Sequence, residues 1–460
     1  MSGPIALEPD GGEGDTLALR LAVPDTTLSL RLPWRKRVAD DPVDTLAAEL
    51  ADHIGPAVHA YEVAAVLESE GLTGEQIQER YGHPDLFSLA RDLYQRVPRS
   101  FPEPPAGGDP WAPDHVRCAL RGALFALPGL AYLLTGRLWH SEQGLYGLVA
   151  AGLLSWAWGQ ALSHRAYLWL AAGRREAGRS LLVGAPAGAL LASLAGYAVA
   201  GPGPAALFGV GQSLYLAAAG VLLVCGRERT LLATLSPLMA GAATLLWWDP
   251  GPVVRIGLPV LTVVLSCAAA AHGIAGMLST GAAEGTRRPR LADSVPYGLF
   301  GLSAGVLVMS VGRQQPLAVI TLTVSMGPAE WLLYRYRGLS VAALRAAADE
   351  AGFRLRSLRT LVICLGGYLA PLVPAALLTG TEPAPLLTVA AVLWAALLLQ
   401  AFGIAWPSAA VTLAAATGVV TAALLGAPPG LPVLPLLCGT AAGALVLAVL
   451  WLLGRPTAHA

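Results

Sequence analysis

Polar side chains that interrupt the apolar runs of this sequence are its candidates for chemistry. Apart from scattered Ser and Thr, they are Arg121, Gln160, His164, Arg165, Gln212, His272, Glu330, Arg335 and Gln400. Glu330 is the acid of this set. An ionisable group inside a bilayer costs on the order of a few kcal/mol unless it faces a cavity or a partner. We therefore expect Glu330 either to form a structural pair with one of the three arginines, or to take part in substrate binding or proton coupling.

The three arginines, Arg121, Arg165 and Arg335, are expected near one mouth of the protein if its two halves face each other. Two interpretations are open. A long arginine side chain near a helix end can extend to the membrane interface without any further role. Alternatively, the guanidinium groups capture an anionic head group, because their donors match phosphate and carboxylate. We keep all three as candidate substrate-binding residues, together with Glu330.

Three further candidate substrate-binding residues are His272, Gln212 and Gln400. His272 follows a run of small residues, where a histidine can hydrogen bond between closely packed helices or act in a proton relay. Gln212 and Gln400 lie in different apolar runs at different heights. An amide in such a run commonly joins two helices by a hydrogen bond, so a structural role is the simpler interpretation for both.

The sequence contains no motif for catalysis, nucleotide binding or metal binding. It lacks a P-loop, a nucleophile elbow and an HExxH pair, and its five cysteines show no CxxC or Cys/His spacing. We therefore predict a protein that is not an enzyme, with no cofactor and no nucleic-acid partner.

The composition predicts an all-α polytopic membrane protein. Hydrophobic residues make up 55% of the chain and charged residues only 13%, whereas soluble globules contain about 25% charged residues. From residue 118 onward the apolar runs are about 18 to 25 residues long, the length of helix that crosses a ~30 Å hydrocarbon core. We predict twelve transmembrane helices, at 118–135, 144–166, 181–200, 205–225, 230–248, 256–278, 297–312, 316–336, 360–379, 385–405, 408–426 and 430–453.

The predicted spans form a repeat of six. The end of the second span resembles that of the eighth, with Gly159 matching Gly327, Ala161 matching Ala329, and Arg165 close to Arg335. Because six is even, the halves 118–280 and 297–454 have the same orientation and are expected to be related by an axis along the membrane normal. Such a duplication builds two bundles around a central cavity. Residues 281–296 are the linker between the halves, and 455–460 are a tail.

Arginine placement predicts the orientation. Loops that follow even-numbered spans are rich in arginine, as in 174–179, 227–229, 287–290 and 337–359, whereas the other loops hold only Arg137, Arg255 and Arg313. Cytoplasmic loops retain positive charge. We therefore expect a plasma-membrane protein with both termini in the cytoplasm.

Residues 1–101 predict a small acidic α+β domain in the cytoplasm. Period-two alternation over 16–23 and 27–32 indicates a β-hairpin, and helical spacing recurs over 43–54, 59–70, 73–81 and 84–97. Thr73 and Gln76 fit a capping box, and Gly71 and Gly82 are natural helix stops. Residues 102–117, rich in Pro and Gly, form a linker to the membrane.

This plan resembles the multidrug, oligosaccharidyl-lipid and polysaccharide flippase superfamily. The resemblance covers residues 118–460 as architecture: two six-span halves, with the second and eighth spans continuing into the cytoplasm as 169–179 and 337–359. Residues 340–359 have the pattern of an amphipathic helix on the inner leaflet. The resemblance implies a flippase that moves an anionic amphiphile, such as a lipid-linked saccharide, by alternating access. The segment His59–Pro98 is similar to soluble portions of uncharacterised actinobacterial membrane proteins, which implies no activity.

Two alternatives remain open. The major facilitator superfamily shares the six-plus-six plan and would imply a small solute, but its motif between spans two and three has only a vestige here, in Arg174–Arg179. A membrane scaffold that transports nothing is the other alternative, with residues 1–101 recruiting a cytoplasmic protein partner such as an envelope enzyme. A central cavity would favour transport, and a filled centre would favour the scaffold.

Overall fold

The computed structural model describes residues 41–100, 112–136, 142–281, 289–347, 349–426 and 431–455. Every element within these ranges is an α-helix or a short 3-10 helix, which confirms an all-helical architecture. The predicted β-hairpin at 16–32 lies outside the described residues. The chain forms two compact units, an N-terminal unit (41–100) and a membrane unit (from 112 onward).

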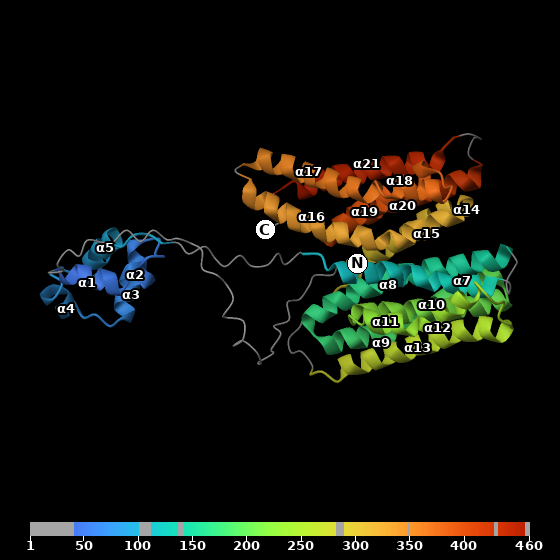
Figure 1. Cartoon of the computed structure of the whole chain (residues 1–460), viewed down its shortest axis with the longest axis horizontal. Helices are drawn as coiled ribbons and strands as arrows, with labels where there is room; N and C mark the ends of the chain where they lie inside the picture. Colours follow the sequence, from blue (N-terminus) through green and yellow to red (C-terminus); the bar gives the residue numbers. More distant parts are fainter. Residues whose placement is uncertain are drawn as a thin grey trace. The chain divides into compact units, whose positions relative to one another are not determined.

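The N-terminal unit is a cluster of short helices around its own apolar core (Figure 1). They are α1 (Pro42–Glu49), α2 (Ala51–Ile54), α3 (Ala60–Ser69), α4 (Gly74–Glu79) and α5 (Leu86–Arg96). The predicted capping box is confirmed: the Thr73 hydroxyl accepts from the Gln76 N–H at 3.3 Å, and the Gln76 side chain accepts from the Thr73 N–H at 3.1 Å. Gly71 and Gly82 both have positive φ, at 76° and 69°, a conformation that favours glycine at a helix stop.

Arg96, at the end of α5, ties this helix to the start of α1. Its guanidinium lies 2.6 Å from an Asp41 oxygen, 2.7 Å from Asp44 and 2.8 Å from Asp92. Asp41 is also the N-cap of α1 and accepts from the Val43 N–H. The hydrogen bond from Arg96 holds the pKa of Asp41 below its ordinary value of 3.8. Arg96 therefore stabilises the unit as long as its aspartates are ionised.

We expect Arg96→Gln to lower the free energy of unfolding of segment 41–100 at neutral pH. Because the pKa of Asp41 is lower in the folded state, its contribution is present above pH 3.8 and is lost as the pH falls through the folded value. Urea unfolding at several pH values, followed by circular dichroism, measures this. Arg91→Gln, which changes an exposed arginine of the same helix, is the matched control. A difference between wild type and Arg96→Gln that persists unchanged to strongly acid pH would contradict this assignment.

The membrane unit is a bundle of long helices with apolar outer faces (Figure 1). Its first half, α6–α13, consists of α6 (His115–Ala126), η1 (Leu127–Gly129), α7 (Leu130–Thr135), α8 (Glu142–Ala172), α9 (Arg174–Ala200), α10 (Pro204–Val224), α11 (Glu228–Thr234), α12 (Ser236–Thr244) and α13 (Pro252–Leu278). Its second half, η3–α21, consists of η3 (Leu291–Asp293), α14 (Val295–Gln314), α15 (Pro316–Val324), α16 (Met326–Ala346), α17 (Glu350–Leu369), α18 (Leu372–Leu378), α19 (Pro383–Ala401), α20 (Ala405–Leu425) and α21 (Val433–Leu453).

Eleven helices in the described ranges are long and apolar enough to cross a membrane. They correspond to eleven of the twelve predicted spans. The remaining prediction, 230–248, falls on the short helices α11 and α12, of 7 and 9 residues. Pro237 lies in the first turn of α12 and has no N–H to continue the preceding helix, which explains the break at Leu235.

The predicted surface helix at 340–359 is wrong. α16 continues through this region to Ala346, and α17 begins at Glu350 and enters the apolar run that follows. The side chain of Asp349 caps α17 by accepting from the Gly352 N–H at 2.8 Å. This N-cap starts a new helix after a short turn, so the basic and apolar residues of 350–359 become the first turns of a long helix. The 169–179 extension is likewise divided between α8 and α9, which meet at Gly173.

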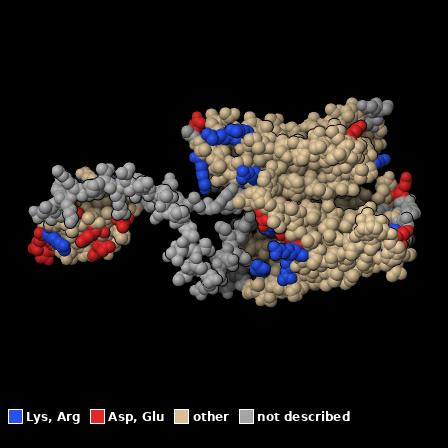
Figure 2. Space-filling view, in the orientation of Figure 1, with Lys and Arg blue, Asp and Glu red and all other residues tan. Residues whose placement is uncertain are grey.

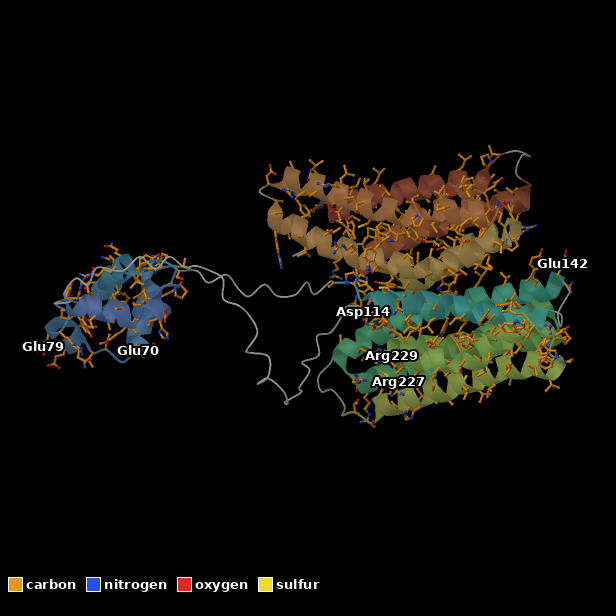
Figure 3. All side chains as sticks on the ribbon, in the orientation of Figure 1. Glu70, Glu79, Asp114, Glu142, Arg227 and Arg229 are labelled. Carbon is orange, nitrogen blue, oxygen red and sulfur yellow. The ribbon has the colours of Figure 1, made fainter. Side chains whose placement is uncertain are left out.

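Arginines gather at one end of the membrane unit, here called the basic end. The junctions α8–α9, α10–α11 and α16–α17 lie there, and their arginines form most of the blue surface of this unit in Figure 2. Arg227 and Arg229 lie at this end and Glu142 at the opposite end (Figure 3). The opposite end has mixed charges, including Asp249, Arg313 and Glu382.

Each half of the membrane unit has its own apolar core, and they differ in how they are filled. In the second half, α19 is buried along most of its length, and Trp394 is fully enclosed between Tyr336 and Tyr368, with ring centroids 6.4 Å apart in both pairs. The first half has a looser core, in which the corresponding central helix α10 carries exposed residues such as Leu207 and Leu214. This difference leaves the space described next.

Candidate functional site

The two halves meet at the basic end where α6 crosses α16. A Cβ added to Gly122 would lie 3.1 Å from the Gly327 Cα, and one added to Gly327 would lie 2.8 Å from the Cys118 carbonyl oxygen. Only glycine at both positions allows this backbone approach, as in small-residue contacts between membrane helices. Next to the crossing, the Trp331 Nε1–H donates to His115 Nδ1 at 2.9 Å. We call this contact the α6–α16 seam.

A buried ion-pair network lies at the seam. The Arg121 guanidinium donates to Glu228 at 2.7 Å and to Glu330, so one arginine joins α6 to α11 in its own half and to α16 in the other. Arg121, Glu228 and Glu330 are each at least nine-tenths buried. Arg117, which is more exposed, donates to Glu228 at 3.1 Å. Two arginines therefore balance the charges of two glutamates, and these pairs offset the desolvation cost of burying each charge.

A cavity of about 1010 Å³ begins at this network and extends toward the opposite end. Its lining residues run from Arg121 to Thr135 on α6–α7 and from Leu145 to Ser163 on α8, with others on α10, α13, α14 and α15. Nearly all of them are apolar, and within the described part of the chain Arg121 is the one charged residue among them. The surface is hollowed between the halves at the end away from the arginines (Figure 2). The cavity is therefore closed at the basic end by the seam.

A second contact between the halves flanks the cavity along α8 and α14. A Cβ added to Gly301 would lie 2.8 Å from the Gln160 Cγ, and one added to Gly305 would lie 2.5 Å from a Leu153 methyl carbon. Near the basic end, His164 stacks on Tyr297 at 3.7 Å and lies 3.1 Å from the Ser294 hydroxyl. This long contact holds the halves together beside the cavity.

The predicted residues divide into those at the cavity and those away from it. Arg121 and Gln212 line it, and Glu330 lies directly behind Arg121. The Gln212 amide accepts from the Tyr132 hydroxyl at 2.8 Å and donates to the Leu148 carbonyl at 3.3 Å, so it also joins three helices.

The other four predicted residues lie away from the cavity and from the ion-pair network. Arg165 donates to the Pro289 carbonyl oxygen at 3.4 Å and lies over the Trp169 ring, and Arg335 is exposed. The expected cluster of three arginines is therefore not formed. His272 is exposed on α13, so the expected hydrogen bond between helices is not formed. Gln400 donates to Ser408 at 3.1 Å inside the second half.

Glu228 is a site residue that the sequence did not indicate. It stands between Arg227 and Arg229, a context typical of a solvated loop, and Gly226 at φ +70° turns the chain directly before it. The turn starts α11 at Glu228 and directs this carboxylate inward. The available indication was an acid two residues before the start of the predicted span 230–248. No group of residues suited to holding a metal ion occurs in the described ranges.

No family model matches this sequence, and comparisons with curated proteins and with solved structures give no match either.

We expect Arg121→Leu to destabilise the protein by about 3–5 kcal/mol, because it leaves the buried Glu330 carboxylate without its partner and Glu228 with only the more exposed Arg117. Glu330→Gln should cost less, since Arg121 retains Glu228. Thermal unfolding in detergent measures both. Arg335→Leu, on the same helix as Glu330 but exposed, is the matched control and should change little. Arg121→Leu with wild-type thermal stability would show that the network does not stabilise the seam.

Proposed function

We propose that this protein moves an amphiphile across the plasma membrane by alternating access between its two halves. The observation that carries the proposal is the cavity, which is large, mostly apolar, lined by both halves and closed at one end by a contact between them. Its volume lies at the upper limit of ordinary ligand pockets, ~300–1,000 Å³. A central cavity favours transport over a scaffold. Apolar walls favour an amphiphile over a small polar solute.

The contacts between the halves support a repeat related by an axis along the membrane normal. If α6–α7 and α8 are spans one and two, then α14 and α15–α16 are spans seven and eight. The first span packs on the eighth and the second on the seventh. Exchanging the halves turns each of these contacts into the other, as such an axis requires.

Within the proposal, a lipid-linked saccharide is the substrate class implied by the family resemblance. An anionic head group has weaker support than the sequence suggested. Of the three arginines expected at the mouth, only Arg121 lines the cavity, and Glu228 and Glu330 already balance its charge.

The orientation proposed places the basic end in the cytoplasm, because positive charge is retained there. With native cysteines replaced, Arg229→Cys should be protected from an impermeant thiol reagent in intact cells, and Arg313→Cys should react. Both arginines are exposed at opposite ends of the unit, so each cysteine is accessible to solvent. Labelling of Arg229→Cys from outside would reverse the orientation.

Locking the α6–α16 seam tests alternating access. In the same cysteine-free background, His115→Cys and Trp331→Cys should be joined by a short, reducible bifunctional thiol reagent, since the native side chains are in hydrogen-bond contact. Joining them should stop the movement of a fluorescent lipid-linked saccharide in liposomes, and reduction should restore it. Each single cysteine treated with the same reagent is the control. Movement no faster than in protein-free liposomes would refute this substrate, and movement unaffected by the cross-link would refute alternating access at the seam.

A further inference from the structure

Gln160 places a buried amide on the wall of the cavity, and this amide has no hydrogen-bond partner in the part of the chain that the structure describes. It lies on α8, is nine-tenths buried and lines the cavity toward the closed basic end. Among the residues that the structure describes, none forms a hydrogen bond with its side chain. A buried amide normally has such a partner, and leaving it without one is costly. Gln160 is therefore unlike Gln212 and Gln400, whose amides are both bonded to protein.

The Gln160 amide reaches accessible space. In the described ranges some side-chain polar atoms are fully enclosed and lack a hydrogen-bond partner, for example the Ser155 and Tyr215 hydroxyl oxygens. The amide atoms of Gln160 are not among these enclosed atoms. The cavity is a space that this side chain lines. Ser163, one helical turn further along α8, is also buried, lines the cavity and has no hydrogen-bond partner within the described part of the chain. It lines a second, smaller pocket between α8, α9 and α10 as well.

The backbone opposite Gln160 leaves room for this side chain. On α14, Gly301 faces it, and a Cβ there would lie 2.8 Å from the Gln160 Cγ. The side chain is thus held against a neighbouring helix along its stem while its amide stays unbonded. Such an arrangement fixes the direction of two donors and one acceptor.

The closed end of the cavity is polar but carries no net charge. Arg121 is its charged lining residue, and with Arg117 it is balanced by Glu228 and Glu330. An anion bound there would compete with two carboxylates already in place. An uncharged hydrogen-bonding group meets no such competition and matches the free donors and acceptors of Gln160 and Ser163.

We infer that the closed end of the cavity, with Gln160 as its specificity-determining residue, binds the uncharged, hydrogen-bonding head group of an amphiphile whose apolar part contacts the remaining walls. Hydroxyl and amide groups are the head-group chemistry that this site accepts, and an anionic head group is disfavoured. This inference rests on the transport function proposed above.

The test compares two lipids in phosphatidylcholine vesicles that contain the full-length protein. Glucosylceramide with a fluorescent acyl chain offers an uncharged polyhydroxyl head, and phosphatidic acid with the same chain offers an anionic one. Quenching by dithionite reports movement between leaflets. We expect wild type to move the glucosyl lipid faster. Gln160→Leu should slow that lipid about three- to tenfold, as expected for loss of a hydrogen bond, and leave phosphatidic acid unchanged.

Thermal unfolding separates binding from folding. Gln160→Leu removes an amide that has no partner among the described residues, so the melting temperature of this variant should not fall. Gln400→Leu is the matched control: it breaks the bond to Ser408, should lower the melting temperature and should keep the wild-type lipid preference. Ser163→Ala, a smaller change at the same site, should slow the glucosyl lipid in the same direction.

The outcomes distinguish the two proposals. Faster movement of phosphatidic acid, or equal effects of Gln160→Leu on both lipids, would overturn the inference and leave transport standing. No movement of either lipid by wild type would overturn amphiphile transport and this inference with it.

Discussion

The contact between Arg121 and its two glutamates is the constraint on which the membrane unit depends. A buried arginine in a bilayer is tolerated only with partners, and here they come from α11 in the same half and α16 in the other. Gly122 and Gly327 bring the helices close enough for these bonds to form. The network therefore sets the register of α6 against α16 and fixes where the cavity ends.

The two halves that the Arg121 network joins are packed unequally. In the second half, Trp394, Tyr336 and Tyr368 fill the centre around α19, which makes that half a solid body. The looser first half supplies most of the lining of the cavity of about 1010 Å³, and the second half supplies the rest. In the proposed alternating access, movement of a filled half against a hollow one would open and close space mainly on one side. The residues that line the cavity are mostly those of α6–α13, and α14, α15, α16 and α19 supply the rest of the wall.

Local sequence patterns predicted local structure well and long-range contacts poorly. The capping box at Thr73 and the glycine stop at Gly82 depend on neighbours in the chain, and both were found. The cost of an unpaired Glu330 indicated either an arginine partner or a functional role, and the structure shows the arginine pair. The choice of Arg121 over Arg165 or Arg335 depends on how the helices cross. Glu228 was missed because a charge between two arginines suggests a loop, and the turn at Gly226 that directs it inward has no distinctive pattern. Gln160 stood among the polar residues, yet only the structure shows that it has no hydrogen-bond partner among the described residues, whereas Gln212 and Gln400 have one.

The position of Arg121 limits the cost of separating the halves in the proposed cycle. Glu228 belongs to the same half as Arg121, so this pair can persist when α16 moves away, and the arginine is not left uncompensated. Glu330 is the group that loses its partner, and it does so where the opening seam admits water, which lowers the cost of its charge. The nearby Trp331–His115 hydrogen bond breaks at the same step. In the proposed cycle, Arg121 can thus hold the seam closed through Glu330 and still release it, because the pair with Glu228 compensates its charge when the seam opens.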